Sequence, residues 1–120
     1  NGAMNGPHPR SITAPELQEW LLDERLDPLL VDVREDRELE IAPFPATVLH
    51  LPLSRSEAWL QDLGRQLPEG RSVVVVCHAG VRSLHFGLWL LEQRQSLEVW
   101  NLEGGIEAWS LQVDPSVPRY

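Results

Sequence analysis

The sequence predicts an α/β protein with a mainly parallel sheet that is covered by helices on both faces. Short apolar runs rich in branched residues alternate with amphipathic stretches, and turn residues or charges separate them. One run, Val73–Val76, is apolar throughout, as a strand covered on both faces requires. With 120 residues and 42% apolar content, the chain is long enough for one core, so we expect a single domain.

The first elements follow a segment without apolar rhythm. Residues 1–9 are rich in Gly, Pro and Asn and are expected to be a disordered leader or a cloning scar. A capping box that starts at Thr13 then predicts a helix over 14–23. The branched apolar run 29–33 is typical of a buried strand, and the alternating charges that follow predict a short helical turn over 34–40.

The next stretch combines proline breaks with a second capping signal. Prolines stop the preceding helical turn, and the path of residues 42–47 is left open. A strand is expected over 47–51. A second capping box, from Ser54 to Glu57, predicts a helix that continues to Leu67.

The strand expected over 72–76 ends at Cys77, the only cysteine in the sequence. Small residues then permit a tight turn, and a largely apolar stretch over 81–91 predicts a helix with Arg82 in its first turn. Ligands of such sheets bind beyond the carboxyl ends of the strands, where Cys77 stands. The helix N-terminus and Arg82 both favour a thiolate there, so we expect Cys77 to be nucleophilic.

One more strand, over 97–102, is followed by a Gly-Gly turn and a short helix over 106–111. We therefore expect residues 10–112 to form the domain and residues 113–120 to form a flexible C-terminal tail.

The composition argues against several classes of partner. The formal net charge is −8 at pH 7, there is no lysine, and the ten arginines are scattered, which argues against nucleic acid and against membrane surfaces. A single cysteine cannot form an internal disulfide, and the sequence has neither a charged-then-apolar targeting leader nor a long apolar segment, so a cytoplasmic location is expected. The four histidines lack partners at ligand spacing, so no metal is expected.

Three stretches carry a resemblance to a known family: Leu30-Val31-Asp32-Val33-Arg34 with Glu38-Leu39, the loop Cys77-His78-Ala79-Gly80-Val81-Arg82-Ser83, and Leu102-Glu103-Gly104-Gly105-Ile106-Glu107-Ala108-Trp109. In this order they resemble the first signature, the active-site loop and the last signature of rhodanese-like sulfurtransferases. The resemblance spans about residues 11–111, and three ordered signatures are far more specific than one loop.

The resemblance implies a mainly parallel five-stranded sheet with helices on both faces. It implies that Cys77 takes a sulfane sulfur from a donor such as thiosulfate, forms a persulfide and passes the sulfur to a thiophilic acceptor. The expected partners are a small sulfur donor and a thiol or cyanide acceptor, or a protein acceptor. No cofactor is implied, because the cysteine itself carries the sulfur.

The resemblance also suggests roles for the other loop residues. Arg82 is expected to hold an anion at the end of the loop. Two roles stay open for Ser83, which either bonds the persulfide or satisfies backbone groups of the first helical turn. His78 either orients an acidic donor or faces solvent. Backbone N–H groups are expected from Ala79, Gly80 and Val81.

Asp32 and Arg34 are expected to support the loop from the neighbouring strand. By the resemblance, Asp32 lies near the loop, where a structural hydrogen bond is its expected role. Arg34 and Glu38 stand four residues apart, so a solvated ion pair on a turn is the alternative to loop support.

Two other functions stay open. Cysteine phosphatases and arsenate reductases use a similar thiolate cradle, but the related phosphatase loops are one residue longer than the His78–Val81 segment between Cys77 and Arg82. A non-catalytic interaction module of the rhodanese-like kind is the third possibility. The presence of both Cys77 and Arg82 favours the enzyme.

Overall fold

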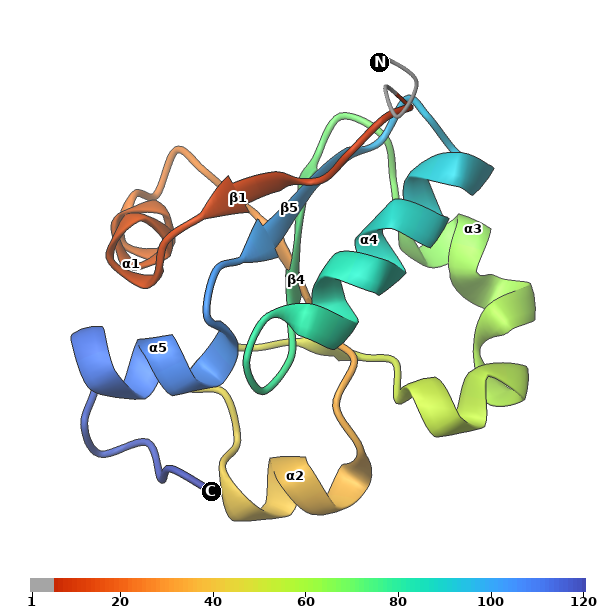
Figure 1. Ribbon diagram of the computed structural model, residues 1–120. Coiled ribbons are helices and arrows are strands. Elements are labelled where there is room, and N and C mark those ends of the chain that lie inside the picture. The colour runs from red at the N-terminus through yellow and green to blue at the C-terminus, as the bar shows by residue number, and fades with distance from the viewer. Residues whose placement is uncertain (1–5) are drawn as a thin grey trace.

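The computed structural model describes residues 6–120 (Figure 1). The predicted α/β fold class is confirmed: five strands form one parallel sheet in the order β1-β5-β4-β2-β3. The strands are β1 (Arg10–Ile12), β2 (Leu29–Asp32), β3 (Leu49–His50), β4 (Ser72–Val76) and β5 (Glu98–Leu102). The α-helices are α1 (Ala14–Leu22), α2 (Asp36–Ile41), α3 (Leu63–Gln66), α4 (Val81–Gln93) and α5 (Gly105–Gln112).

The central strand β4 is buried on both faces of the sheet. Because successive side chains of a strand point to opposite faces, Val73, Val75 and Cys77 join the core beneath α3 and α4. Val74 and Val76 join the second core, which α1 and α5 cover. Figure 1 shows α3 and α4 on one side of the sheet and α1 and α5 on the other. The thiol of Cys77 therefore lies on the α4 side.

The N-terminal elements agree with the sequence except for one strand. The predicted capping box is present: the Glu16 N–H donates to the Thr13 hydroxyl (3.2 Å), and the Thr13 N–H donates to the Glu16 carboxylate (2.9 Å). Strand β1 was not among the four runs expected as strands. It has only three residues, of which only Ile12 is buried, so it lacks a recognisable apolar run. The leader prediction for residues 1–5 lies outside the described residues.

The single helix predicted from Ser54 to Leu67 is wrong. The chain instead forms two 3₁₀ segments, η2 (Leu53–Ala58) and η3 (Leu60–Asp62), followed by the four-residue α3. The Ser54 hydroxyl, expected to cap a helix, donates to the Glu35 carboxylate, which also accepts the Ser54 N–H (3.2 Å). A partner distant in sequence therefore replaces the local cap.

Residues 113–120, expected to be a flexible tail, lie against the domain. Val117 is buried in the core beneath α1 and α5, and its carbonyl accepts a hydrogen bond from the Ser110 hydroxyl (2.7 Å). Arg119 pairs with Glu107 of α5 (2.6 Å). These contacts bring the C-terminus close to α2 (Figure 1). Among the helices of residues 6–120, none is long and apolar enough to cross a bilayer.

Candidate active site

Cys77 lies at the carboxyl end of β4, where the chain turns into α4. The backbone N–H of Gly80 donates to the Cys77 Sγ atom (3.1 Å). Gly80 is the N-cap of α4 and has φ +97°, a left-handed conformation that glycine adopts without strain. A side chain there would also press on the backbone of Gly104, 3.1 Å from its first carbon. As the sequence predicts, the sulfur faces the N-terminus of a helix.

Two buried polar side chains complete the surroundings of the sulfur. The Ser83 hydroxyl lies 3.2 Å from Cys77 Sγ and donates its proton to Asn101 Oδ1 (2.5 Å). The Asn101 amide is oriented by its second hydrogen bond, from Nδ2 to the Gly80 carbonyl (3.1 Å). Since a hydroxyl carries one proton, Ser83 accepts the hydrogen bond from the Cys77 thiol. Asn101 was missed from sequence, although a polar residue inside the otherwise apolar end of β5 was the available signal.

The N-terminus of α5 binds the backbone of the cysteine loop. The N–H groups of Ile106 and Glu107 donate to the carbonyls of Cys77 (2.9 Å) and His78 (3.0 Å). These are first-turn N–H groups without partners inside the helix. A Cβ on Gly105 would lie 2.4 Å from the His78 carbonyl oxygen, so only glycine permits this approach. The last of the three signatures therefore supports the cysteine loop directly.

Arg82 forms a two-pronged ion pair with Glu38 of α2. Its Nη1 and Nη2 atoms donate to Oε1 (2.7 Å) and Oε2 (2.8 Å), and its side chain remains 37% exposed. Hydrogen bonds from Arg82 hold the pKa of Glu38 at about 2, well below its ordinary value. The Glu38 hydrogen bonds raise the pKa of Arg82, and the charge of a Cys77 thiolate adds to this rise, so Arg82 and the sulfur interact electrostatically.

Asp32 and Arg34 form a second pair that is fully buried. Arg34 Nη2 lies 2.9 Å from Asp32 Oδ2, and both side chains are inaccessible to solvent. Burial alone would lower the pKa of Arg34, but its hydrogen bonds to Asp32 and Tyr120 raise it. The sequence-based alternative of a solvated Arg34–Glu38 pair is therefore wrong, because Asp32 takes the first residue and Arg82 takes the second.

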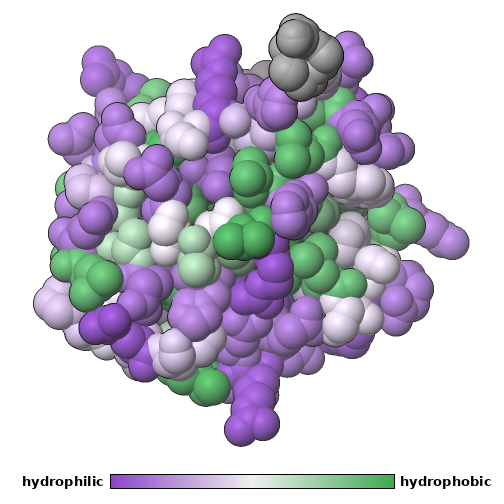
Figure 2. Space-filling view, in the orientation of Figure 1, coloured by the Kyte–Doolittle hydropathy of each residue, from purple (hydrophilic) through white to green (hydrophobic). Residues whose placement is uncertain are grey.

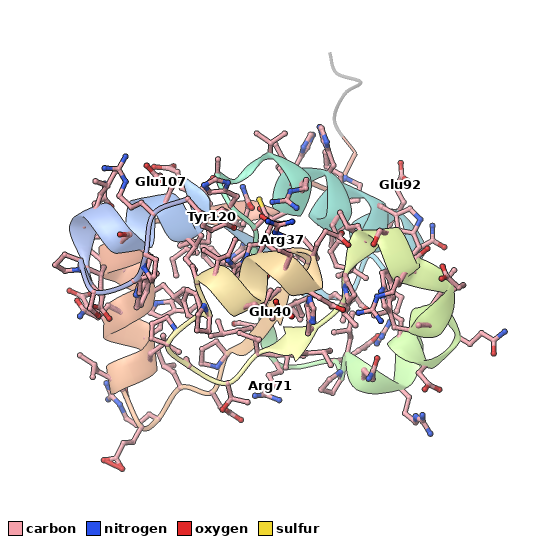
Figure 3. The ribbon with its side chains drawn as sticks, turned by 90° about the horizontal axis from the view of Figure 1, so that it is seen from below. Arg37, Glu40, Arg71, Glu92, Glu107 and Tyr120 are labelled. Atoms are coloured by element: carbon pink, nitrogen blue, oxygen red, sulfur yellow. The ribbon has the colours of Figure 1, made fainter. Side chains whose placement is uncertain are left out.

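Tyr120 joins these two pairs and was not singled out from sequence. Its hydroxyl accepts from Arg34 Nη1 (3.0 Å) and donates to Glu38 Oε2 (2.7 Å). Its ring stacks on His78, with centroids 4.0 Å apart and planes at 20°. Figure 3 shows Tyr120 between α5 and α2. The His78 side chain is half-buried under this contact and still reaches solvent, so both roles left open for His78 stay open.

The remaining loop residues lie outside this cluster. Ala79 is exposed, and Val81 is 60% exposed on the first turn of α4. The structure thus gathers Cys77, Gly80, Arg82 and Ser83 at one edge of the sheet. Within residues 6–120, no group of three or more His, Cys, Asp or Glu side chains is placed to hold a metal ion.

A groove of about 440 Å³ runs beside Arg82 along α4. Its other lining residues are mostly apolar or aromatic: Leu53, Ser56, Trp59, Leu60, His85, Phe86 and Trp89. Figure 2 shows hydrophobic residues gathered on the same face of the molecule. A larger hollow, of about 730 Å³, lies around Arg71 and Trp100. It is at the amino ends of the strands, whereas Cys77 is at the carboxyl end of β4. Of these two hollows, only the groove along α4 is lined by a residue of the cysteine loop, Arg82.

The family model described as Rhodanese-like domain matches residues 13–112. The chain is 30% identical to the structure of a rhodanese-like domain protein from Staphylococcus aureus, which superposes with a TM-score of 0.68 over 83% of this chain and 90% of that one. The resemblance inferred from the three signatures is confirmed.

Two curated relatives are longer proteins. The chain is 41% identical over 91 residues to the "Rhodanese-like/PpiC domain-containing protein 12, chloroplastic" of Arabidopsis thaliana, covering 76% of this chain and 30% of that protein. It is 33% identical over 110 residues to the "Probable adenylyltransferase/sulfurtransferase MoeZ" of Mycobacterium tuberculosis, covering 92% of this chain and 27% of that protein. The chain thus spans less than a third of the length of each.

Proposed function

This chain belongs to the rhodanese-like family, and we propose that it is a sulfurtransferase that carries a sulfane sulfur on Cys77. The observation that carries the proposal is the position of the sulfur, which meets the Gly80 N–H at the start of α4 in a loop that ends at Arg82. A thiolate and a persulfide anion both gain from such a helix N-terminus. The relative named a sulfurtransferase supports the same reaction class.

In the first step, a donor such as thiosulfate places its outer sulfur against the Cys77 thiolate. The thiol proton has left to solvent, and the thiolate electron pair forms the new sulfur–sulfur bond. The donor's own sulfur–sulfur bond breaks, and its electron pair departs with sulfite. Arg82 is 37% exposed, and a guanidinium has five N–H groups, of which two donate to Glu38, so the others are free to attract the dianionic donor.

In the second step, a cyanide or thiolate acceptor attacks the outer sulfur of the persulfide. The sulfur leaves with the acceptor as thiocyanate or as a new persulfide, and the Cys77 thiolate returns. The Ser83 hydroxyl lies 3.2 Å from Cys77 Sγ and would bond an anionic sulfur by turning its proton from Asn101 to that sulfur. The groove along α4 begins beside Arg82 and offers an apolar surface for the body of an organic acceptor.

Mass spectrometry of the intact chain tests the proposal directly. After incubation with thiosulfate and removal of the excess, we expect one added sulfur on the wild-type chain, released by cyanide as thiocyanate. Cys77→Ser, the control, should gain none. A wild-type chain that takes up no sulfur at saturating donor contradicts the proposal. Hydrolysis of an aryl phosphate that depends on Cys77 would instead favour the phosphatase alternative.

A further inference from the structure

The C-terminal segment, residues 113–120, contributes a side chain to the surroundings of the cysteine loop. Val117 anchors the segment in the core, and the Arg119–Glu107 pair fixes it to α5. These two contacts place Tyr120 between α5 and α2, as Figure 3 shows. The ring then meets His78, the residue directly after Cys77.

The direction of each hydrogen bond at the Tyr120 hydroxyl follows from its partners. Arg34 carries only donors, so the hydroxyl oxygen accepts from Nη1 (3.0 Å). The hydroxyl proton is therefore directed to Glu38 Oε2, 2.7 Å away. Burial raises the pKa of Tyr120 to about 12, which keeps this donor protonated at neutral pH.

Glu38 Oε2 accepts two hydrogen bonds, one from Tyr120 and one from Arg82 Nη2 (2.8 Å). A carboxylate that already accepts from a phenol is a weaker partner for the guanidinium than one that does not. Tyr120 thus reduces the competition between Glu38 and any anion that approaches Arg82.

We propose that Tyr120 is a positioning residue for anion binding at the cysteine loop: by bonding Glu38 it leaves Arg82 more available to an anionic sulfur donor, and through His78 it supports the loop rim. The proposal deepens the proposed function and rests on it for the identity of the anion. The contacts of Tyr120 with Glu38 and His78 do not depend on sulfur transfer, and the alkylation test below does not require it.

Alkylation of the only cysteine measures the effect without sulfur transfer. Iodoacetate and iodoacetamide have nearly the same size, so the ratio of their rates at Cys77 cancels access and thiol reactivity and reports the local attraction for an anion. In Tyr120→Phe, which keeps the ring and removes the hydroxyl, we expect this ratio to fall about threefold to tenfold, the range for part of one charge-assisted hydrogen bond. With thiosulfate as substrate, KM should rise and kcat should change less.

Ser116→Ala is the matched control. It also removes one hydroxyl from the C-terminal segment without changing charge. That hydroxyl donates to Asp114, two residues earlier (2.5 Å). Its rate ratio should equal that of the wild type. If circular dichroism shows that Tyr120→Phe is folded and its iodoacetate-to-iodoacetamide rate ratio equals that of the wild type, the proposal is overturned.

A second variant covers the case in which Tyr120→Phe is too unstable to label. Glu38→Gln keeps an acceptor for the tyrosine hydroxyl but removes the charge that competes for Arg82, so the rate ratio should rise above that of the wild type. An unchanged or lower ratio overturns the proposal. A chain that shows the expected ratios but forms no persulfide would overturn the proposed function and leave the role of Tyr120 intact.

Discussion

Two arginine–carboxylate pairs lie at the same end of the sheet, and they differ in exposure. Asp32 and Arg34 are fully buried, whereas Arg82 is 37% exposed and its partner Glu38 is 17% exposed. A pair that is inaccessible to solvent cannot offer its donors to a ligand that arrives from solvent. A pair at the surface keeps donors directed outward. The same chemistry is thus closed to solvent in one place and open to it in the other.

The largest effect is expected from breaking the buried pair. Arg34→Leu leaves the Asp32 carboxylate buried without its partner, which costs about 3–5 kcal/mol of the free energy of unfolding. Urea unfolding followed by circular dichroism measures this loss. Arg25→Leu, which breaks the exposed pair with Asp23, is the control and should cost far less, because solvent already screens that pair. Equal losses in the two variants would contradict the expected difference between a buried and an exposed ion pair.

Breaking the surface pair should change activity more than stability. Arg82→Gln removes the cation that faces the donor, and persulfide formation from thiosulfate should slow about 100-fold, as for loss of one oxyanion donor. The free energy of unfolding should change by about 1 kcal/mol or less. Quenched single-turnover mass spectrometry gives the rate. Arg37→Gln, which changes an exposed arginine of α2, should behave as the wild type.

A conservative exchange should distinguish charge from geometry. Arg34→Lys keeps the positive charge but cannot bond Asp32 twice and Tyr120 once, so we expect a loss of about 1–3 kcal/mol in stability. Arg82→Lys should be less costly to stability, because solvent reaches that site. Thermal unfolding of both variants makes the comparison. A lysine that is tolerated equally at both positions would contradict it.

The smallest effect concerns acid. The pKa of Glu38 is about 2 in the folded chain and near its ordinary value when unfolded, so its ionised form stabilises the fold. This contribution is complete above the unfolded pKa of about 4.5 and is lost as the pH falls toward about 2. The stability difference between wild type and Glu38→Gln should therefore shrink between about pH 6 and about pH 3. A difference that grows on acidification would have the wrong sign.

The cysteine loop was predictable because its parts are adjacent in sequence. A valine strand, a glycine turn and the start of α4 together place Cys77 and Arg82, and each has a local signal. The side chains that pair with Arg82 and with Glu38 lie far away in the sequence and give no local signal. Glu38 stands 44 residues from Arg82, and Tyr120 stands 82 residues from Glu38, so only the folded chain brings them together.

The failed helix after Ser54 has the same physical origin. The capping pattern is present in the sequence, but the Ser54 hydroxyl donates to Glu35, 19 residues earlier, instead of capping a helix. The segment forms short 3₁₀ turns. The capping box at Thr13 held because no distant acceptor takes its hydroxyl, which bonds Glu16 instead. Local patterns therefore predict elements well where tertiary partners do not compete for the same atoms.

The contact between α5 and the cysteine loop has a practical consequence for dissecting the chain. The Ile106 and Glu107 N–H groups hold the carbonyls of Cys77 and His78, yet they belong to a helix that begins more than twenty residues later. A fragment that stops after α4 would keep every residue of the loop from Cys77 to Ser83 and lose the two N–H groups that hold its backbone. The sequence of the loop alone therefore does not fix its backbone, which also depends on a helix that forms later in the chain.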